Sequence, residues 1–264
     1  MENMKENFRK ISFKIENNFF LTVIRHGLTL MIQFILMGGV ACALMNLPFV
    51  DYTVVIGNSD LMWLYKIFET VYQGTFGLFS LVLAIVLALC YGMERNETVD
   101  KVALYIVVSL GAFGAQLNIA SDEFDIGNLG AQGSFSAMFI VLLSCFAYEK
   151  LKRITALTLR KYAVGMESLC ANAIQALLPM VVIIAMVVAF TRILYLCFGV
   201  YNLHELFSLF SCSLFENMGN NFSAGLLYTF LLHVLWICGF HGSHLLEPVA
   251  QTTFATVSKD VVFL

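Results

Sequence analysis

Charged residues are scarce in this chain, and their scarcity decides its class. Only 12% of the 264 residues are charged, whereas soluble globular proteins carry roughly a quarter. No cluster of basic residues interleaved with aromatic ones occurs, so nothing indicates nucleic-acid binding. The composition therefore excludes an ordinary soluble domain, and a hydrophobic content of 59% indicates a membrane protein.

Cysteine is present but forms no pattern. The seven cysteines are scattered along the chain, and no C-x-x-C pair occurs. Most of them lie inside apolar runs, where cysteine behaves as a small hydrophobic residue. We therefore expect no structural disulfide, no zinc site and no cofactor.

Long apolar runs dominate the rest of the sequence. Several approach or reach the roughly 20 residues that cross a hydrocarbon core of about 30 Å. They predict an all-α, polytopic membrane protein with about six transmembrane spans and a re-entrant or broken segment near the C-terminus. The predicted spans are residues 21–45, 70–91, 102–120, 134–148, 171–198 and 224–240. Residues 203–214 form an amphipathic stretch of about three turns, too short to span.

The positions of Lys and Arg predict the orientation. Twelve of the 15 lie on one side of the predicted spans, in the N-terminal segment and in the loops after the second and fourth spans. No small-residue cleavage site follows the first apolar run, so residues 1–20 are not a cleavable signal. We expect them to form a cytoplasmic lead-in.

Few ionisable residues fall inside the spans, where each is expensive and a candidate for function. Arg25 and His26 stand at the start of the first span, and we expect both to lie at the membrane interface. His233 stands in the sixth run, where we expect a satisfied packing residue rather than a ligand.

The segment WICGFHGSHLLEP, residues 236–248, concentrates polar residues near the end of the chain. The spacing of His241, His244 and Glu247 would allow metal chelation from one helix face. Gly242 and Pro248 argue against a regular helix, however, and favour a broken segment whose side chains line a cavity. We favour the second interpretation, in which Trp236 offers a flat apolar face to a sugar ring. The candidate substrate-binding residues are His241, Trp236, Gly242, His244 and Glu247.

Two motifs in this chain resemble a known family. The first is W-x-x-G-F-H-G, from Trp236 to Gly242, and the second is L-G-x-x-G-x-F-x-A, from Leu129 to Ala137. Both resemble the membrane-spanning enzyme IIC of bacterial sugar phosphotransferase systems (PTS), in the lactose/cellobiose/diacetylchitobiose branch. The first span, which closes at N-L-P, is also similar, and the resemblance covers nearly the whole chain.

The resemblance implies a function and an organisation. It implies a permease in the bacterial cytoplasmic membrane that binds and translocates a β-linked disaccharide for phosphorylation by an enzyme IIB partner. It also implies a homodimer, in which the first five spans form the contact, and a motif histidine, here His241, that contacts the sugar. On this basis residues 1–20 are the lead-in, 21–200 the five-span dimerisation-like region, and 201–264 the start of an incomplete sugar-binding region.

Two features of the family have no counterpart in this sequence. The glutamate of the family's N-E-P hairpin is not found, because Glu247-Pro248 lies within the histidine segment and follows leucine. The proline-rich motif before the fifth span is replaced by YAVGMESLCANA. Catalytic residues are therefore unassigned, and enzymatic activity is left open. The alternative functions are a transport-incompetent, sugar-sensing membrane input module for a signalling domain, and a truncated paralogue.

Overall fold

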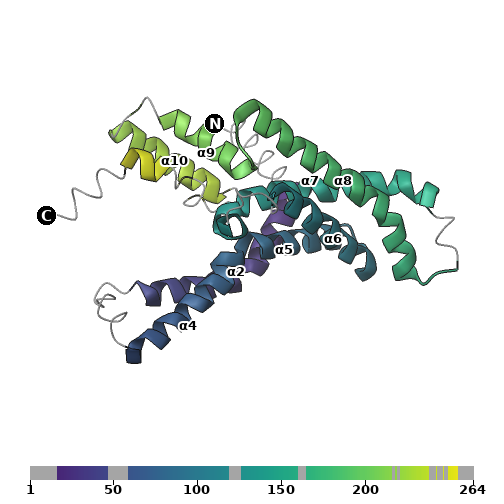
Figure 1. Cartoon of the computed structure of the whole chain (residues 1–264), viewed down its shortest axis with the longest axis horizontal. Coiled ribbons are helices and arrows are strands. Elements are labelled where there is room, and N and C mark those ends of the chain that lie inside the picture. The colour runs from purple at the N-terminus through teal and green to yellow at the C-terminus, as the bar shows by residue number, and fades with distance from the viewer. Residues whose placement is uncertain are drawn as a thin grey trace, which may run out of the picture.

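The described part of the chain is helical (Figure 1). The computed structural model describes residues 17–46, 59–118, 126–159, 165–215, 218, 221–237, 242, 246 and 249–254. The longer helices are α2 (Phe19–Met45), α4 (Ser59–Thr75), α5 (Phe79–Glu94), α6 (Val99–Gln116), α7 (Ser134–Leu159), α8 (Ser168–Phe198), α9 (Leu203–Phe215) and α10 (Phe222–Ile237). Within these described ranges, five helical stretches are long and apolar enough to cross a membrane, and α10 is a shorter apolar helix. The predicted all-α, polytopic membrane fold is confirmed.

Two helices differ from the predicted spans. The second span begins at Ser59 instead of residue 70, because α4 runs through a short 3₁₀ turn, Phe76–Leu78, directly into α5. The fourth does not end at residue 148, because α7 continues to Leu159. Glu, Lys and Arg favour helix almost as strongly as alanine, so the charged sequence EKLKR extends the helix instead of ending it.

Local signals fix several helix ends. Asn18 caps α2, because its side-chain oxygen accepts hydrogen bonds from the backbone N–H groups of Phe20 (3.0 Å) and Leu21 (3.3 Å). Helix α8 ends at Gly199, whose φ of 70° is a left-handed conformation that glycine adopts readily. Asn202 and Glu205 then form a reciprocal cap at the start of α9, in which each side chain accepts a backbone N–H bond.

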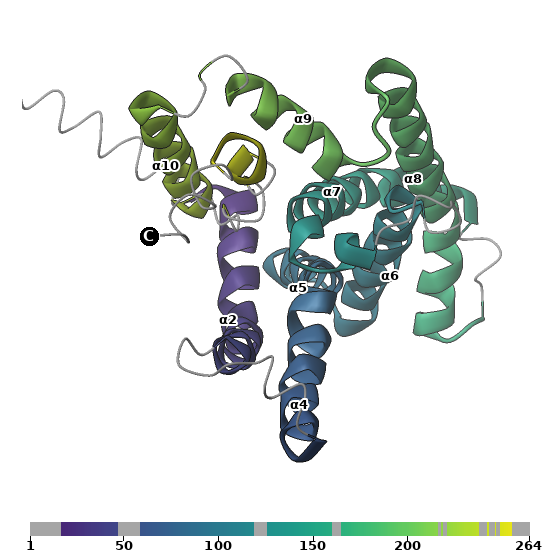
Figure 2. The same ribbon diagram turned by 60° about the vertical axis from the view of Figure 1, so that its left-hand side comes forward.

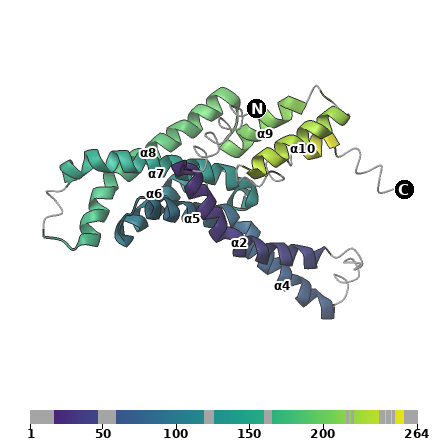
Figure 3. The same ribbon diagram turned by 180° about the vertical axis from the view of Figure 1, so that it is seen from behind.

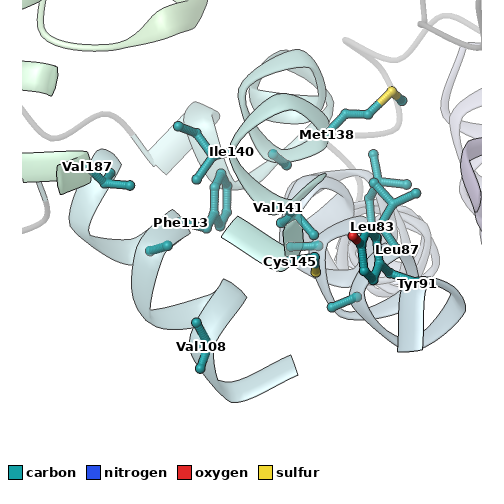
Figure 4. Close-up of a cluster of buried hydrophobic side chains, with 14 of the residues drawn as sticks. Leu83, Leu87, Tyr91, Val108, Phe113, Met138, Ile140, Val141, Cys145 and Val187 are labelled. Atoms are coloured by element: carbon teal, nitrogen blue, oxygen red, sulfur yellow. The ribbon is translucent and has the colours of Figure 1, made fainter. Parts of the chain in front are cut away.

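The main core lies among α5, α6, α7 and α8, with α2 packed on α5. Figure 4 shows Leu83 and Leu87 of α5 with Val141 and Cys145 of α7 in this cluster of buried side chains. The Cys145 sulfur lies 3.1 Å from the Ser109 hydroxyl and so links α6 to α7. Since lipid is as apolar as these side chains, close packing and buried polar contacts hold such a bundle together.

The outer elements are arranged around this bundle. Helix α4 packs against α2, and the pair projects beyond α5–α8 in two views (Figure 1, Figure 2). Helices α9 and α10 lie beyond the end of α8 that is remote from the α7–α8 connection (Figure 1, Figure 3). A second, smaller cluster is formed there by the buried residues Phe215, Ala224, Leu246 and Val249.

Candidate functional site

The predicted sugar-binding segment is described only in part. Trp236 lies in the last turn of α10, and Gly242 and Leu246 follow it. His241, His244 and Glu247 lie outside the described residues, so their roles stay predictions. Among the described residues, no group of three His, Cys, Asp or Glu could hold a metal ion. That observation leaves the metal alternative untested, because its three ligands are not among them.

The chain turns back along α10 after Trp236. A Cβ atom at Gly242 would lie 2.8 Å from the Leu232 carbonyl oxygen and 3.3 Å from Leu235 Cβ, so only glycine fits this close approach. Further on, the ring of Phe254 lies 5.4 Å from that of Tyr228, one turn nearer the start of α10. Gly242 and Phe254 therefore lie beside successively earlier turns of α10. Contrary to the expectation for Gly242, the described residues there have helical hydrogen bonds, because the Leu246 N–H donates to the Gly242 carbonyl oxygen (3.0 Å) and the Ala250 N–H to that of Leu246 (2.9 Å).

Two side chains of α10 can be placed directly. The indole of Trp236 is half-exposed (52%) at the end of the helix. His233, one turn earlier on the same face, places Nδ1 at 2.7 Å from the Thr229 carbonyl oxygen of its own helix. This contact agrees with the expectation that His233 is satisfied within its helix. The Trp236 indole is thus partly exposed at the end of α10, on the side of the chain that leads to Gly242.

A second group of polar residues was not foreseen from the sequence. It lies where α5 ends and α6 begins, together with the last turns of α7 and the first turns of α2, and we call it the charged end. Its ion-paired members are His26, Glu94, Arg95, Glu97, Lys101, Glu149, Lys152 and Arg153.

Glu149 of α7 is the most buried carboxylate of the charged end. It accepts a hydrogen bond from the Tyr91 hydroxyl (2.8 Å), and Arg95 Nη2 lies 2.9 Å from the same oxygen. The Arg95 guanidinium in turn stacks on the Phe19 ring, 3.8 Å from its centroid. One carboxylate therefore connects α7 to α5 and, through Arg95, to α2.

Glu97, in the turn between α5 and α6, is the centre of a second set of ion pairs. It accepts a hydrogen bond from Lys152 of α7 and lies 3.2 Å from Lys101 Nζ. Lys152 also donates to the Tyr105 hydroxyl (2.8 Å). Burial acts to raise the pKa of Glu97, but the hydrogen bonds from Lys152 and Lys101 outweigh it and hold that pKa below its ordinary value.

His26 and Asp100 join further helices to the charged end. His26 Nδ1 lies 2.7 Å from Glu94 Oε1, which ties α2 to α5. The Ser168 hydroxyl donates to Asp100 at 3.3 Å and brings the start of α8 to α6. Arg25 is exposed, as expected for an interfacial residue, whereas His26 has a specific partner that the sequence did not reveal.

The charged end is suited to holding helices together. Its carboxylates are matched to cations, and none of them faces a nucleophile or an open metal site among the described residues. A sequence signal for it does exist, since GMERNETVDK and EKLKR both fall on the predicted cationic side. Pairing them requires contacts 55 and 58 residues apart, and one sequence does not supply such a register.

Comparisons with known proteins identify relatives of this chain. The family model described as "Phosphotransferase system, EIIC" matches residues 25–261. Three curated relatives from Bacillus subtilis (strain 168) are similar over most of this chain. The oligo-beta-mannoside-specific EIIC component of a PTS is 23% identical over 95% of this chain and 57% of its own length. The putative permease IIC component YwbA is 24% identical over 93% of this chain and 57% of its own length. The lichenan permease IIC component is 23% identical over 93% and 56%.

One solved structure has the same fold. It is the crystal structure of the transporter ChbC, the IIC component from the N,N'-diacetylchitobiose-specific phosphotransferase system, with a TM-score of 0.61 and 21% identity. The likeness covers 93% of this chain and 59% of that one. This chain therefore spans somewhat more than half the length of the relatives that it matches.

Proposed function

Because the chain belongs to the family of phosphotransferase system EIIC proteins, we propose that it binds a sugar in the membrane and takes part in its translocation and phosphorylation with an enzyme IIB partner. The observation that carries this proposal is the extent of the family match, from residue 25 to residue 261. That range includes all five candidate membrane spans except the first turns of α2, together with α10 and the histidine segment.

The proposed substrate is a β-linked disaccharide. Two of the relatives are named for an oligo-beta-mannoside and for lichenan, and the solved structure comes from a system specific for N,N'-diacetylchitobiose. The half-exposed Trp236 supports a sugar ligand, because an indole offers a flat apolar face and an N–H donor. A broken membrane segment is also where transporters commonly place polar substrate contacts.

In the proposed site the residues of this chain bind and orient the sugar. Trp236 stacks on one face of a ring, and His241 exchanges hydrogen bonds with its hydroxyls. Gly242 allows the backbone to lie close to α10, and His244 and Glu247 complete the polar lining. Phosphoryl transfer depends mostly on positioning and electrostatics, so holding the acceptor hydroxyl in place is the contribution expected of this chain.

Calorimetric titration tests this assignment of His241. N,N'-diacetylchitobiose or cellobiose is titrated into the purified protein in detergent, and into its His241→Ala variant. Loss of a hydrogen bond to the sugar is expected to weaken binding by about tenfold. His233→Ala is the matched control, because its ring is bonded within its own helix, and it should bind like the wild type. Equal affinity of folded His241→Ala and wild-type protein would contradict the assignment.

We further propose that the charged end faces the cytoplasm and that the protein lies in a bacterial cytoplasmic membrane. The support is the excess of Lys and Arg on that side of the spans. In a variant whose seven native cysteines are replaced by serine, single cysteines placed at Asn96 and at Tyr201 should label from opposite sides of inverted and right-side-out vesicles. Labelling of both from the same side would contradict the orientation.

A homodimer is proposed on the family resemblance. The exposed apolar side chains of the projecting pair α2 and α4, such as Leu36, Met37 and Trp63, are compatible with a contact between copies. Cross-linking of a cysteine at residue 37 in native membranes would support the dimer. A single-copy mass in mild detergent, together with no cross-link, would contradict it.

A further inference from the structure

Helix α7 exposes a stripe that changes character along its length. Phe139, Leu143 and Phe146 are exposed apolar residues, and Lys150 and Arg153 continue the same face. The spacing of four, three, four and three residues places all five on one side of the helix. At about 1.5 Å per residue, the apolar part extends for roughly 10 Å before the cationic part begins.

The first turn of α2 meets this stripe where its character changes. The exposed ring of Phe20 lies 6.1 Å from the ring of Phe146. The ammonium group of Lys150 lies over the Phe146 ring, 5.3 Å from its centroid. We call the surface formed by Phe20, Leu143, Phe146, Lys150 and Arg153 the α2–α7 seam.

The two cations of the seam differ from their neighbours in their partners. Arg95, Lys101 and Lys152 are each matched to a carboxylate within the charged end. Lys150 has no carboxylate within ion-pair distance among the described residues. Arg153 is 71% exposed and reaches only one, Glu149, at 3.6 Å.

Glu149 is already committed to other donors. Tyr91 and Arg95 bind its Oε2 atom at 2.8 and 2.9 Å, whereas Arg153 lies 3.6 Å from Oε1, the longest of the three contacts. Most of the donor groups of Arg153 therefore point into the surroundings. Lys150 thus stands over the exposed Phe146 ring, and Arg153 lies one turn further along the same face of α7.

We propose that the α2–α7 seam binds an anionic phospholipid. Its phosphate lies between Lys150 and Arg153, since a guanidinium and an ammonium group are the usual phosphate donors. Its acyl chains lie on Phe20, Leu143 and Phe146. A soluble anion would use only the cationic part, whereas a phospholipid matches both parts in their observed order along the helix.

Native mass spectrometry of the full chain tests this site. The protein is released from mixed micelles that contain phosphatidylglycerol and phosphatidylcholine with identical acyl chains. The expected result is a bound phosphatidylglycerol, preferred over phosphatidylcholine by on the order of tenfold at low salt. In the Lys150→Gln/Arg153→Gln variant this preference should disappear.

The matched control removes the same two residue types elsewhere. Lys66→Gln/Arg192→Gln takes one exposed Lys and one exposed Arg from α4 and α8, and it should keep the preference for phosphatidylglycerol. An equal loss in both double variants would overturn the site in favour of a net-charge effect. If inorganic phosphate displaced the lipid completely, the proposed contact between the acyl chains and the aromatic side chains would be wrong. If a second copy of the chain covered the α2–α7 seam, the whole proposal would be wrong.

Discussion

Glu149 shows how an apolar helix bundle accommodates a charged residue. A carboxylate removed from water is costly unless it is paired and hydrogen-bonded. Here the Tyr91 hydroxyl and the Arg95 guanidinium supply these contacts, and the Phe19 ring covers the guanidinium. The result ties α2, α5 and α7 together at one end of the bundle.

Replacing Glu149 should therefore destabilise the protein measurably. Glu149→Ala leaves Tyr91 and Arg95 without their acceptor and is expected to cost about 2 kcal/mol of unfolding free energy. Thermal unfolding in detergent measures the effect as a lower melting temperature. Glu69→Ala, an exposed carboxylate on α4, is the control and should change little. Equal melting temperatures for the two variants would show that Glu149 does not anchor the helices.

Glu97 predicts how stability depends on acidity. Its pKa is lower in the folded protein than the ordinary value of 4.5, because Lys152 and Lys101 outweigh the effect of burial. A carboxyl group whose pKa is lowered by folding stabilises the folded protein at pH values above its unfolded pKa. This stabilisation is lost as the pH falls through the folded pKa.

The pH dependence of melting should therefore be shallower in a Glu97→Gln variant. The melting temperature of the wild-type protein should fall as the pH is lowered from about 5 to 3, and that of the variant should fall less. Glu69→Gln removes an exposed carboxylate instead and should follow the wild type. Parallel curves for Glu97→Gln and wild type would mean that the pair with Lys152 and Lys101 adds no stability.

At the scale of elements, the L-G-x-x-G-x-F-x-A motif explains the turn that precedes α7. A Cβ atom on Gly133 would lie only 1.8 Å from the carbonyl oxygen of Asn128. That same oxygen accepts a hydrogen bond from the buried Ser80 hydroxyl (2.8 Å) and so fastens the turn to the start of α5. Neither the Asn128 carbonyl group nor α5 can move away easily, so only glycine fits at position 133.

A Gly133→Ala variant should fold poorly. Overpacking against a fixed backbone is expected to cost about 3 kcal/mol, seen as lower yield and a lower melting temperature. Gly39→Ala in α2 is the matched control, because nothing lies within 4 Å of its Cβ position. Alanine favours helix over glycine by about 1 kcal/mol, so the control should be unchanged or more stable. A well-folded Gly133→Ala protein would contradict the packing described.

The sequence predicted the helices that coincide with long apolar runs. The predicted span was too short where a charged segment continues the helix. The amphipathic stretch 203–214 matches α9, because its spacing and its Asn202 and Glu205 cap are local signals. Helix α7 continues to Leu159, past the predicted end of the fourth span, because charged residues end a membrane span but favour the continuation of a helix.

At the scale of the whole molecule, α9 joins two regions of packing. Leu203 belongs to the main core, whereas Phe207 and Cys212 pack on the smaller cluster beside α10. The reciprocal cap of Asn202 and Glu205 fixes the corner between α8 and α9. The proposed sugar-binding region is thus attached to the bundle through a short, well-defined corner.

The sequence located the histidine segment but not its surroundings. Glycine and proline predicted a break, but Gly242 accepts a helical hydrogen bond from the Leu246 N–H and packs close to Leu232 and Leu235, while Pro248 lies outside the described residues. The partners of His26 and Glu149 were beyond reach, because they lie 68 and 58 residues away along the chain. The roles of His241, His244 and Glu247 are still predictions.

Tryptophan fluorescence tests the proposed sugar site most directly, because the chain contains only two tryptophans. Trp63 lies on α4 and Trp236 on α10. In a Trp63→Phe variant, emission from Trp236 should change and saturate as N,N'-diacetylchitobiose or cellobiose is added, and in Trp236→Phe no change should follow. A sugar-dependent change that persists in Trp236→Phe, or its absence in Trp63→Phe while calorimetry detects binding, would contradict the account.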